Sequence, residues 1–556
     1  MKYLAIAGMA VMGTVVGMAA GGATAQTMIA VDGGKIEGTT LPSGVRAWLG
    51  VPFAAPPVRE LRWRAPQPVA PWRGVFHADR KGPECIQLLR RKDINHYFGE
   101  EATSEDCLYL NVWAPAKDKA PASASASASA ANKLPVIVFI HGGGFTVGSS
   151  GMALYGGENV AARGDAIFVN MNYRLGILGY MAHPELTAES PHRASGNYGF
   201  LDQIAALQWI QKNIARFGGD PARVTISGQS AGAASVGTLL ASPLAKGLFQ
   251  RAVLMSGAGV SNQAPSLAES EKTGLEVQKA VGAASLDEMR QLPADRVFAV
   301  QRDFQFGESG SVTVKPNIDG YVLPDTIPNL YAAGKQNDVP VMAGFTADDI
   351  SFSPLRAVAT LEQFRATAAH MYGDRVQQFF DLYPAATDTE AVRMGRLYSR
   401  QAMIEKGTRA LALAHTQAQQ AGGKAPFYMF MFARVQPFNP AVRLKDNPQG
   451  AYHTSDVPYW FQTQDALNMF RPTRNWQPYD RALSRRMMDS LLAFARSGDP
   501  ATPATPWPRW RADSAQYLEF GDSVTVQSED AAQMDFQNQP VNIAPGGSPL
   551  PRMTRD

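Results

Sequence analysis

A short strand-like segment that runs straight into a glycine-flanked serine is the most constraining feature of this sequence. Residues 223–227, R-V-T-I-S, contain β-branched residues typical of a strand, and the motif G-Q-S-A-G follows at 228–232. A helix of small residues then begins, which predicts a sharp strand-to-helix turn with Ser230 at its tip. The two glycines fit such a turn because a Cβ at either position would clash. The alternative is a tight glycine turn with an incidental serine.

Strand-like and helical segments alternate along the whole chain. The apolar residues in the strand-like segments are almost continuous, which is typical of strands covered by helices on both faces. Residues 201–216 have helical apolar spacing and end at G-G-D-P, 218–221. With 45% hydrophobic and 18% charged residues, the chain is expected to bury a core. We therefore predict an α/β fold with a mostly parallel central sheet, whose buried strands are 134–140, 166–173, 223–227, 251–255, 339–343 and 425–432.

A second motif opens from the apolar segment 134–140 into His141 and three glycines, 142–144. Consecutive glycines let backbone N–H groups turn toward a ligand, as a site for developing negative charge opposite Ser230 requires. A dinucleotide-binding glycine motif is excluded because Val147 stands where its third glycine is needed. A phosphate-binding loop is also excluded, because no Gly-Lys pair is followed by Ser or Thr. We expect His141 to be a structural hydrogen-bonding residue.

A serine nucleophile needs a base, and in sheets of this type the histidine follows the serine and the acid in the chain. The histidines after Ser230 are His370, His415 and His453. The first two lie in helical patterns, where a lone histidine is usually solvated or a capping group. His453 lies in a loop before the apolar residues 457–461, and it is therefore the predicted base.

The acid is expected in a loop at the end of a strand between the serine and the histidine. The segment 339–343 is such a strand, and Asp348 and Asp349 follow it. Spacing alone does not choose between these two carboxylates.

The ends of the chain and its cysteines point to export. Residues 1–25 combine Lys2, an apolar stretch and the triplet A-T-A, which predicts a secretory signal peptide cleaved before Gln26. An uncleaved membrane anchor is the alternative, and no later segment is apolar enough to span a membrane. Cys85 and Cys107 are the two cysteines, and in an exported protein they are expected to form a disulfide rather than remain free thiols.

The charge balance limits the class of partner. The chain has 52 Lys and Arg against 49 Asp and Glu, a net charge of +3 without a basic block, which argues against nucleic-acid binding. The cysteines have no histidines at the short spacing of a zinc site, and we expect neither a metal nor an organic cofactor. The alanine- and serine-rich residues 117–133 are expected to be a surface loop, and 536–556 a mobile tail. Between the signal peptide and this tail we expect one catalytic domain, 26–535.

Taken together, these motifs resemble the type-B carboxylesterase family, the carboxylesterase and cholinesterase group of α/β hydrolases. The resemblance covers nearly all of the chain after the signal peptide, and the motifs occur in the family's order. They are found at 50–57, 61–63, 104–113, 141–145, 196–199, 217–221, 228–232, 450–456 and 507–510. The resemblance implies an α/β-hydrolase fold, with helical insertions after the helix that follows the serine.

The resemblance also implies a role for each residue of the site. Ser230 is the implied nucleophile, His453 the base, and Asp349, rather than Asp348, the acid. The implied oxyanion donors are the N–H groups of Gly143, Gly144 and Ala231, and the family's first disulfide matches Cys85 and Cys107. Two departures stand out: the acid is Asp where the family usually has Glu, and Gln229 replaces the acidic residue common before the serine. Because the sequence also offers no assignable aromatic site for a cation, the second departure makes a choline ester an unexpected substrate.

We therefore expect a secreted or periplasmic serine hydrolase that cleaves a small neutral or aromatic carboxylic ester through an acyl-enzyme. The same three side chains could serve an amide, carbamate or thioester hydrolase. An alternative of another class is a non-catalytic binding protein on the same fold. Candidate pocket walls are Phe304, Phe306, Phe352, Tyr459, Trp460 and Phe461, although an aromatic residue in a domain this large is more often core than a ligand contact.

Overall fold

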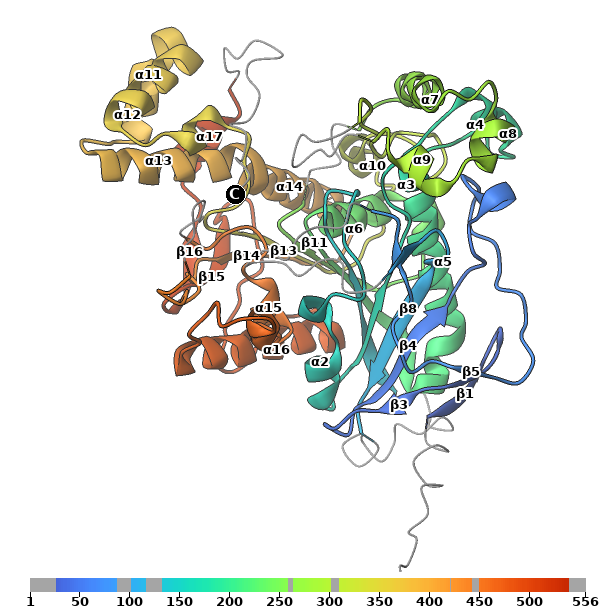
Figure 1. Cartoon of the computed structure of the whole chain (residues 1–556). Coiled ribbons are helices and arrows are strands. Elements are labelled where there is room, and N and C mark those ends of the chain that lie inside the picture. Colours follow the sequence, from blue (N-terminus) through green and yellow to red (C-terminus); the bar gives the residue numbers. More distant parts are fainter. Residues whose placement is uncertain are drawn as a thin grey trace, which may run out of the picture.

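A single mixed sheet joins strands from both ends of the chain (Figure 1). The computed structural model describes residues 27–87, 102–116, 133–258, 264–301, 310–420, 422–442 and 450–539. Within these residues the sheet has eleven strands, and the seven that lie in space from β10 to β15 pair with one another in parallel, whereas β10 and β15 pair antiparallel with β8 and β16 on their outer sides. Their spatial order is β16 (Val524–Ser528), β15 (Gln516–Phe520), β14 (Phe427–Phe432), β13 (Val341–Thr346), β12 (Arg251–Met255), β11 (Gly219–Gln229), β9 (Leu134–Ile140), β10 (Ile167–Met171), β8 (Tyr109–Ala114), β4 (Arg46–Pro52) and β3 (Thr39–Thr40).

Both faces of the sheet are buried, which explains why the central strands are continuously apolar. In β9, Val136 and Val138 belong to one hydrophobic cluster, whereas Ile137 and Phe139 belong to a second cluster on the opposite face. Side chains alternate between the faces of a strand, so a strand covered on both sides needs apolar residues at every position. The predicted α/β fold with a mostly parallel sheet is confirmed.

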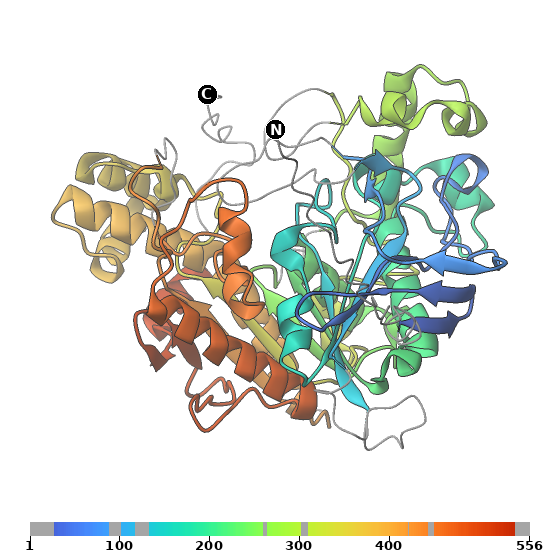
Figure 2. The ribbon, with the colours of Figure 1, turned by 60° about the horizontal axis from the view of Figure 1, so that its bottom comes forward.

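Helices cover the two faces in separate layers. The first cluster includes residues of α5 (Tyr198–Asn213), α6 (Ala231–Ala241) and α14 (Lys406–Gln420). The second cluster includes residues of α2 (Glu158–Ala162) and α16 (Pro478–Ser497), and Figure 2 shows α16 in orange-red across the near side of the sheet. After α5, a short 3₁₀ turn ends at Gly218, whose φ of 96° is the left-handed conformation that glycine tolerates.

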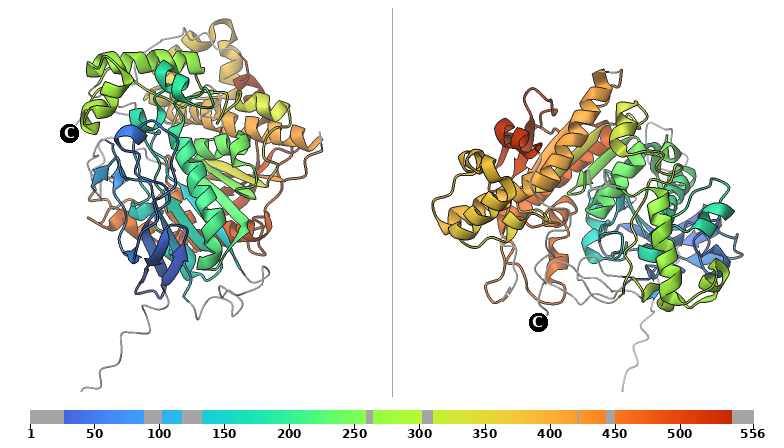
Figure 3. Two further views of the ribbon diagram at one scale, coloured as in Figure 1. Left: turned by 90° about the vertical axis from the view of Figure 1, so that its right-hand side faces the viewer. Right: turned by 90° about the horizontal axis from the view of Figure 1, so that it is seen from above.

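Two helical insertions follow the helix after Ser230, as the resemblance implied. The first lies between β12 and β13 and contains α7 (Leu267–Val281), α8 (Leu286–Gln291), α9 (Ala294–Phe298) and α10 (Ile327–Ala332). The second lies between β13 and β14 and contains α11 (Leu361–Tyr372), α12 (Val376–Leu382) and α13 (Asp388–Arg400) before α14. Helices α7–α9 share a small hydrophobic cluster with residues of helices 176–180 and 184–189, whereas α11–α13 pack around another cluster, and from above the two groups lie on opposite sides of the molecule (Figure 3).

The remaining elements are short. They are β1 (Met28–Val31), β2 (Gly34–Glu37), β5 (Val75–His77), β6 (Glu84–Cys85), β7 (Thr103–Ser104), α3 (Gly176–Tyr180), α4 (Pro184–Glu189), α15 (Val457–Trp460) and α17 (Ala531–Gln537). Helix α17 runs past the predicted start of the tail at 536, because Phe536 is buried against Tyr372 with ring centroids 4.8 Å apart. The predicted signal peptide 1–25, most of the loop 117–133 and the tail from 540 lie outside the described residues. None of the described helices is long and apolar enough to cross a membrane.

Candidate active site

Ser230 lies at the turn between β11 and α6 with φ 58° and ψ −124°. Such a backbone conformation costs a non-glycine residue about 1–3 kcal/mol, and close packing on both sides holds it in place. A Cβ on Gly228 would lie 2.3 Å from the carbonyl oxygen of Gly232, and a Cβ on Gly232 would lie 2.0 Å from that of Ile140. The Ser230 N–H donates to the Met255 carbonyl at 2.8 Å, which fastens the turn to β12. Ser230 itself remains partly exposed.

Asp349 and His453 meet across two loops. Asp349 follows β13 and is fully buried, and its Oδ1 lies 2.6 Å from His453 Nδ1. The backbone N–H groups of Thr346 and Ile350 donate to Asp349 Oδ2 and Oδ1 at 3.0 and 2.7 Å. Burial alone would raise the pKa of Asp349, but the attraction and hydrogen bond of His453 and the backbone donor hold that pKa below its usual value. Asp349 is therefore ionised at neutral pH.

The ionised carboxylate fixes the tautomer of the imidazole. Nδ1 of His453 carries the proton and donates to Asp349, which leaves the lone pair on Nε2. His453 Nε2 lies 3.1 Å from the amide nitrogen of Gln229, the residue directly before Ser230. The imidazole thus faces the serine turn with its basic nitrogen. The described hydrogen bonds include none between Ser230 Oγ and His453, a contact that is often long or absent before substrate binds.

Asp348 and Asp349 contact different parts of the histidine loop. Asp348 Oδ2 accepts a hydrogen bond from the Ala451 N–H at 3.0 Å, and its Oδ1 lies 3.7 Å from Arg396 Nη1. Asp348 therefore holds the backbone of the histidine loop, whereas Asp349 holds the imidazole. The residue spacing left this choice open, and the resemblance assigned the acid to the residue that the structure places on the imidazole.

The glycine turn after β9 packs directly on the serine turn. A Cβ on Gly142 would lie 2.6 Å from the Gln229 carbonyl oxygen and 2.9 Å from Ser230 Cβ, so a side chain has no room there. Gly143 and Gly144 have φ values of 112° and 63°. Among the described residues, no acceptor takes a hydrogen bond from the N–H of either glycine. Ala231 is the first residue of α6, where an N–H has no acceptor within the helix.

The other histidines considered in the sequence do not place a ring nitrogen at the serine turn as His453 does. His141 is buried and stacks on Tyr173 with ring centroids 4.4 Å apart, and its Nδ1 lies 2.9 Å from the Gly142 carbonyl. Burial lowers the pKa of His141 to about 4, so this ring is neutral and structural. His415 donates to the Ala425 carbonyl at 2.9 Å, and His370 is exposed on α11.

Cys85 and Cys107 form a disulfide whose neighbouring segment supports the glycine turn. Gln87, two residues after Cys85, accepts a hydrogen bond from the Gly148 N–H at 2.8 Å and donates to the Gly148 carbonyl at 2.9 Å. Gly148 follows the three glycines in the same loop. The disulfide therefore lies near a segment that is hydrogen-bonded to the loop of the three glycines.

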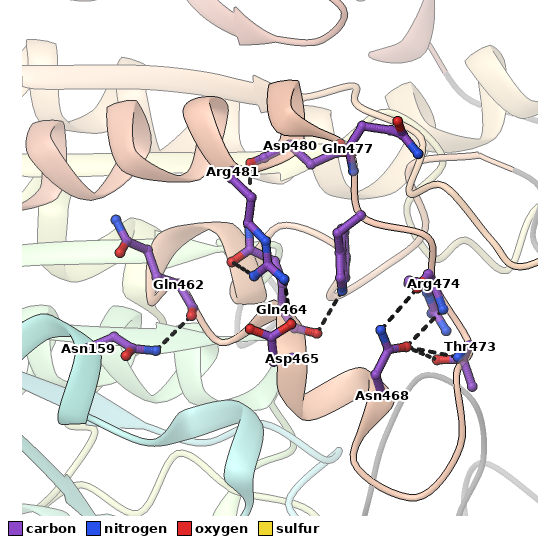
Figure 4. Close-up of polar contacts among 11 residues, drawn as sticks. Asn159, Gln462, Gln464, Asp465, Asn468, Thr473, Arg474, Gln477, Asp480 and Arg481 are labelled. Carbon is purple, nitrogen blue, oxygen red and sulfur yellow. Dashed lines mark hydrogen bonds and ion pairs between the residues drawn. The ribbon is translucent and has the colours of Figure 1, made fainter. Parts of the chain in front are cut away.

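A buried polar network lies behind the histidine loop, and sequence reasoning did not identify it. Arg474 is buried, and its Nη2 donates to the Tyr452 hydroxyl at 3.0 Å while its Nε donates to Gln436 Oε1 at 2.9 Å. Gln436 in turn donates to the Ser455 carbonyl at 2.9 Å, so residues on both sides of His453 are held. Figure 4 shows how Asn468 anchors the backbone of Arg474.

A second buried carboxylate, Asp456, lies three residues after His453. One of its oxygens accepts a hydrogen bond from Trp460 Nε1 at 3.1 Å, and the other has no hydrogen-bond partner among the described residues. Burial, reinforced by the negative charge of Asp349, raises the pKa of Asp456 to about 6. In the sequence, the buried state of Asp456 was indicated only by its position between His453 and the apolar residues 457–461.

The candidate pocket walls divide between core and surface. Tyr459, Trp460 and Phe461 are fully buried in the cluster under α16, so they are core. Phe352 is 53% exposed. Phe304 and Phe306 lie outside the described residues. In the described part of the chain, no group of three or more His, Cys, Asp or Glu residues is arranged to hold a metal ion.

Comparison with known proteins identifies the family of this chain. The model of the family described as "Carboxylesterase family" matches residues 25–537, nearly the whole chain. The chain belongs to the carboxylesterase family. Membership confirms the resemblance drawn from the motifs, and it makes the protein a carboxylic-ester hydrolase.

Relatives in sequence and structure span almost the full length. The chain is 34% identical over 500 residues to a fumonisin B1 esterase of Sphingopyxis macrogoltabida, covering 88% of this chain and 86% of the relative. It is 31% identical over 505 residues to the para-nitrobenzyl esterase of Bacillus subtilis, covering 89% and 95%. A solved PNB esterase structure superposes with a TM-score of 0.74 at 29% identity, covering 92% of this chain and 99% of that one.

Proposed function

We propose that Ser230, His453 and Asp349 form the catalytic triad of this carboxylesterase. The observation that carries the proposal is the 2.6 Å contact between Asp349 and His453 Nδ1, with Nε2 turned toward the serine turn. In this arrangement His453 is the general base, and Asp349 fixes its tautomer and stabilises the imidazolium that forms.

We also propose that the N–H groups of Gly143, Gly144 and Ala231 form the oxyanion hole. The contact between the glycine turn and the serine turn supports this role, as does the absence of a described acceptor for the two glycine N–H groups. In comparable sites the loss of one such donor costs about 3–4 kcal/mol of transition-state stabilisation.

The reaction then runs in two halves. Ser230 Oγ attacks the ester carbonyl carbon while its proton passes to His453 Nε2, and the carbonyl oxygen becomes the oxyanion. When the tetrahedral intermediate collapses, the C–O bond to the alcohol breaks and His453 returns the proton to the departing alkoxide. Water, activated by the same imidazole, hydrolyses the acyl-enzyme and frees Ser230.

The test of this proposal is the variant Ser230→Ala. We expect the parent protein to hydrolyse an activated aryl ester and to be labelled by an acylating serine inhibitor. The variant should lose both turnover and labelling and keep the melting temperature within a few degrees, because only one hydroxyl is removed. An inactive parent would support a non-catalytic binding protein, and an active Ser230→Ala variant would refute the triad.

For the substrate we propose a small neutral or aromatic ester. A relative named para-nitrobenzyl esterase supports an aromatic ester, and the neutral Gln229 beside the site provides no attraction for a cationic alcohol. A rate survey over esters that vary in acyl length, alcohol size and aromatic character tests the proposal. A marked preference for a cationic ester would refute it.

A second candidate is hydrolysis of another acyl derivative by the same residues. The chain is 29% identical over 512 residues to a relative from Pseudarthrobacter oxydans, and this relative is named a hydrolase, phenmedipham hydrolase, and not an esterase. An amide, carbamate and thioester matched to the best ester would decide between the two activities through their kcat/KM values.

We further propose that the protein is exported as one catalytic domain that begins at Gln26 and includes helix α17 to Gln537, with residues 1–25 removed as a signal peptide. The disulfide supports export because such bonds persist in oxidising compartments. The sheet that joins strands from residue 39 to residue 528 supports a single domain. N-terminal sequencing of the protein from the periplasm or medium should begin at Gln26.

A further inference from the structure

Gln229 fills the space between the catalytic histidine and the glycine turn. It is the last residue of β11 and is 1% exposed, and its amide nitrogen lies 3.1 Å from His453 Nε2. On the other side, a Cβ on Gly142 would lie 2.9 Å from Gln229 Oε1. The side chain therefore packs against both halves of the machinery that surrounds Ser230.

The direction of the hydrogen bond from Gln229 follows from the other side of the imidazole ring. His453 gives its Nδ1 proton to the buried carboxylate of Asp349, so Nε2 can only accept. The amide N–H of Gln229 must then be the donor, because the opposite amide orientation would set an oxygen against the Nε2 lone pair. Gln229 and Asp349 thus hold the neutral imidazole from its two nitrogens.

We propose that Gln229 is a positioning residue, which holds the neutral imidazole of His453 at the serine turn. With the neutral Gln229 beside it, the imidazole stays able to accept a proton down to a lower pH than it would beside a carboxylate. This inference rests on the proposed triad. It goes beyond the triad because it assigns a role to the residue before the serine, where the sequence departs from the family's usual acidic residue.

The charge of residue 229 matters because the groups around His453 are already mostly acidic. Asp349 lies on Nδ1, and the buried Asp456 interacts with the same imidazole from its own segment. On the neighbouring loop, Asp348 is engaged by Arg396 and by the histidine loop, and Arg356 donates to the Asp348 carbonyl at 2.9 Å. A glutamate at 229 would add a charge about 3 Å from Nε2, closer to the reacting nitrogen than any of these groups.

The amide also suits the change of charge during catalysis. When the Ser230 proton reaches Nε2, that nitrogen changes from acceptor to donor, and the amide N–H can no longer donate to it. An amide can turn to offer its oxygen instead, with no change in its own charge. A carboxylate would stabilise the imidazolium in the resting enzyme as well. At mildly acidic pH a smaller fraction of the enzyme would then hold the neutral imidazole that acts as the base.

The test is the pH dependence of ester hydrolysis in two variants of the full-length mature protein. Gln229→Glu is expected to move the acidic limb of kcat/KM for p-nitrophenyl acetate to higher pH by roughly one unit. Gln229→Met keeps the length of the side chain but removes the hydrogen bond. It is expected to lower kcat by about tenfold, with little change in KM and no shift of the limb.

Gln527→Glu is the matched control, since it adds the same charge on the exposed strand β16. Its acidic limb should coincide with that of the parent. The inference is overturned if the Gln229→Glu limb also coincides with the parent's, if Gln527→Glu moves the limb equally, or if Gln229→Met keeps the parental kcat.

Melting curves accompany each variant, and if Gln229→Glu does not fold, the kcat of Gln229→Met alone decides the positioning role. The two proposals fail separately in this experiment. An inactive parent refutes the proposed function, whereas an active parent with an unmoved limb in Gln229→Glu refutes only the role of Gln229.

Discussion

Asp348 and Ala451 are joined by two hydrogen bonds, one from the Asp348 N–H to the Ala451 carbonyl and one from the Ala451 N–H to Asp348 Oδ2, each 3.0 Å long. Residue 348 precedes the proposed acid, and residue 451 lies two positions before the proposed base. The two loops that carry Asp349 and His453 are therefore hydrogen-bonded to each other directly beside the contact on which the proposed triad depends.

Exchanging the two neighbouring aspartates for asparagine should have very different effects. In Asp349→Asn the amide can donate to Nδ1 and so force the proton onto Nε2, where the base must accept. We expect kcat to fall on the order of 10³–10⁴-fold with the fold intact. Asp348→Asn keeps an oxygen for the Ala451 N–H and should retain kcat within about tenfold. Equal losses in steady-state kinetics would contradict the separate roles of the two residues.

The rate of ester hydrolysis should fall on the acidic side as the imidazole takes up a proton. The base must be neutral to act, because only the neutral imidazole has a lone pair that can accept the Ser230 proton. The pKa of Asp349 is held below its usual value, so this carboxylate stays ionised throughout the fall and contributes no second limb there. A profile of kcat/KM from pH 4.5 to 8 should show a single ionisation on the acidic side. A rate that is flat from pH 5 to 8 would exclude histidine as the base.

Replacing Asp456 by asparagine should stabilise the protein, and more so at higher pH. The pKa of this buried carboxyl is raised to about 6 in the folded state, so its favourable contribution is present at low pH and is lost as the pH rises through 6. The ionised form then costs about 3 kcal/mol at neutral pH. The amide that replaces the carboxyl cannot ionise and can still accept from Trp460 Nε1. The melting temperature of Asp456→Asn should exceed that of the parent at pH 7.5 by more than at pH 4.5, and an equal difference at the two pH values would contradict the shift.

Removing the disulfide should lower both stability and turnover. The double variant Cys85→Ser/Cys107→Ser frees a loop with a sequence separation of 22, which should reduce the free energy of unfolding by about 3 kcal/mol. Because Gln87 near this bond holds Gly148 in the loop that carries the proposed oxyanion donors, kcat should fall more than KM rises. Denaturant titration and steady-state kinetics of the double variant measure the two effects. An unchanged kcat in a destabilised variant would show that the disulfide does not affect the geometry of the proposed active site.

Much of the fold could be predicted because its signals are local. Apolar continuity marked the buried strands, and the glycines around Ser230 marked the turn, since both depend on residues adjacent in the chain. Strand limits were less accurate: the segment predicted at 339–343 is paired as Val341–Thr346, and that at 166–173 as Ile167–Met171. The ends of a strand depend on where its neighbours offer hydrogen-bond partners, which apolar content does not reveal.

The sequence by itself determined the fold class, the nucleophile turn and, through the order of residues, the candidate histidine. Residue spacing left Asp348 and Asp349 open, the resemblance implied Asp349, and only the tertiary structure showed its contact with the imidazole. Only the tertiary structure decided that Tyr459, Trp460 and Phe461 are core and that Gln229 contacts His453. A turn or a strand is specified by neighbours along the chain. A contact between side chains 104 or 224 positions apart is specified by the packing of whole loops, because its formation depends on every element between them.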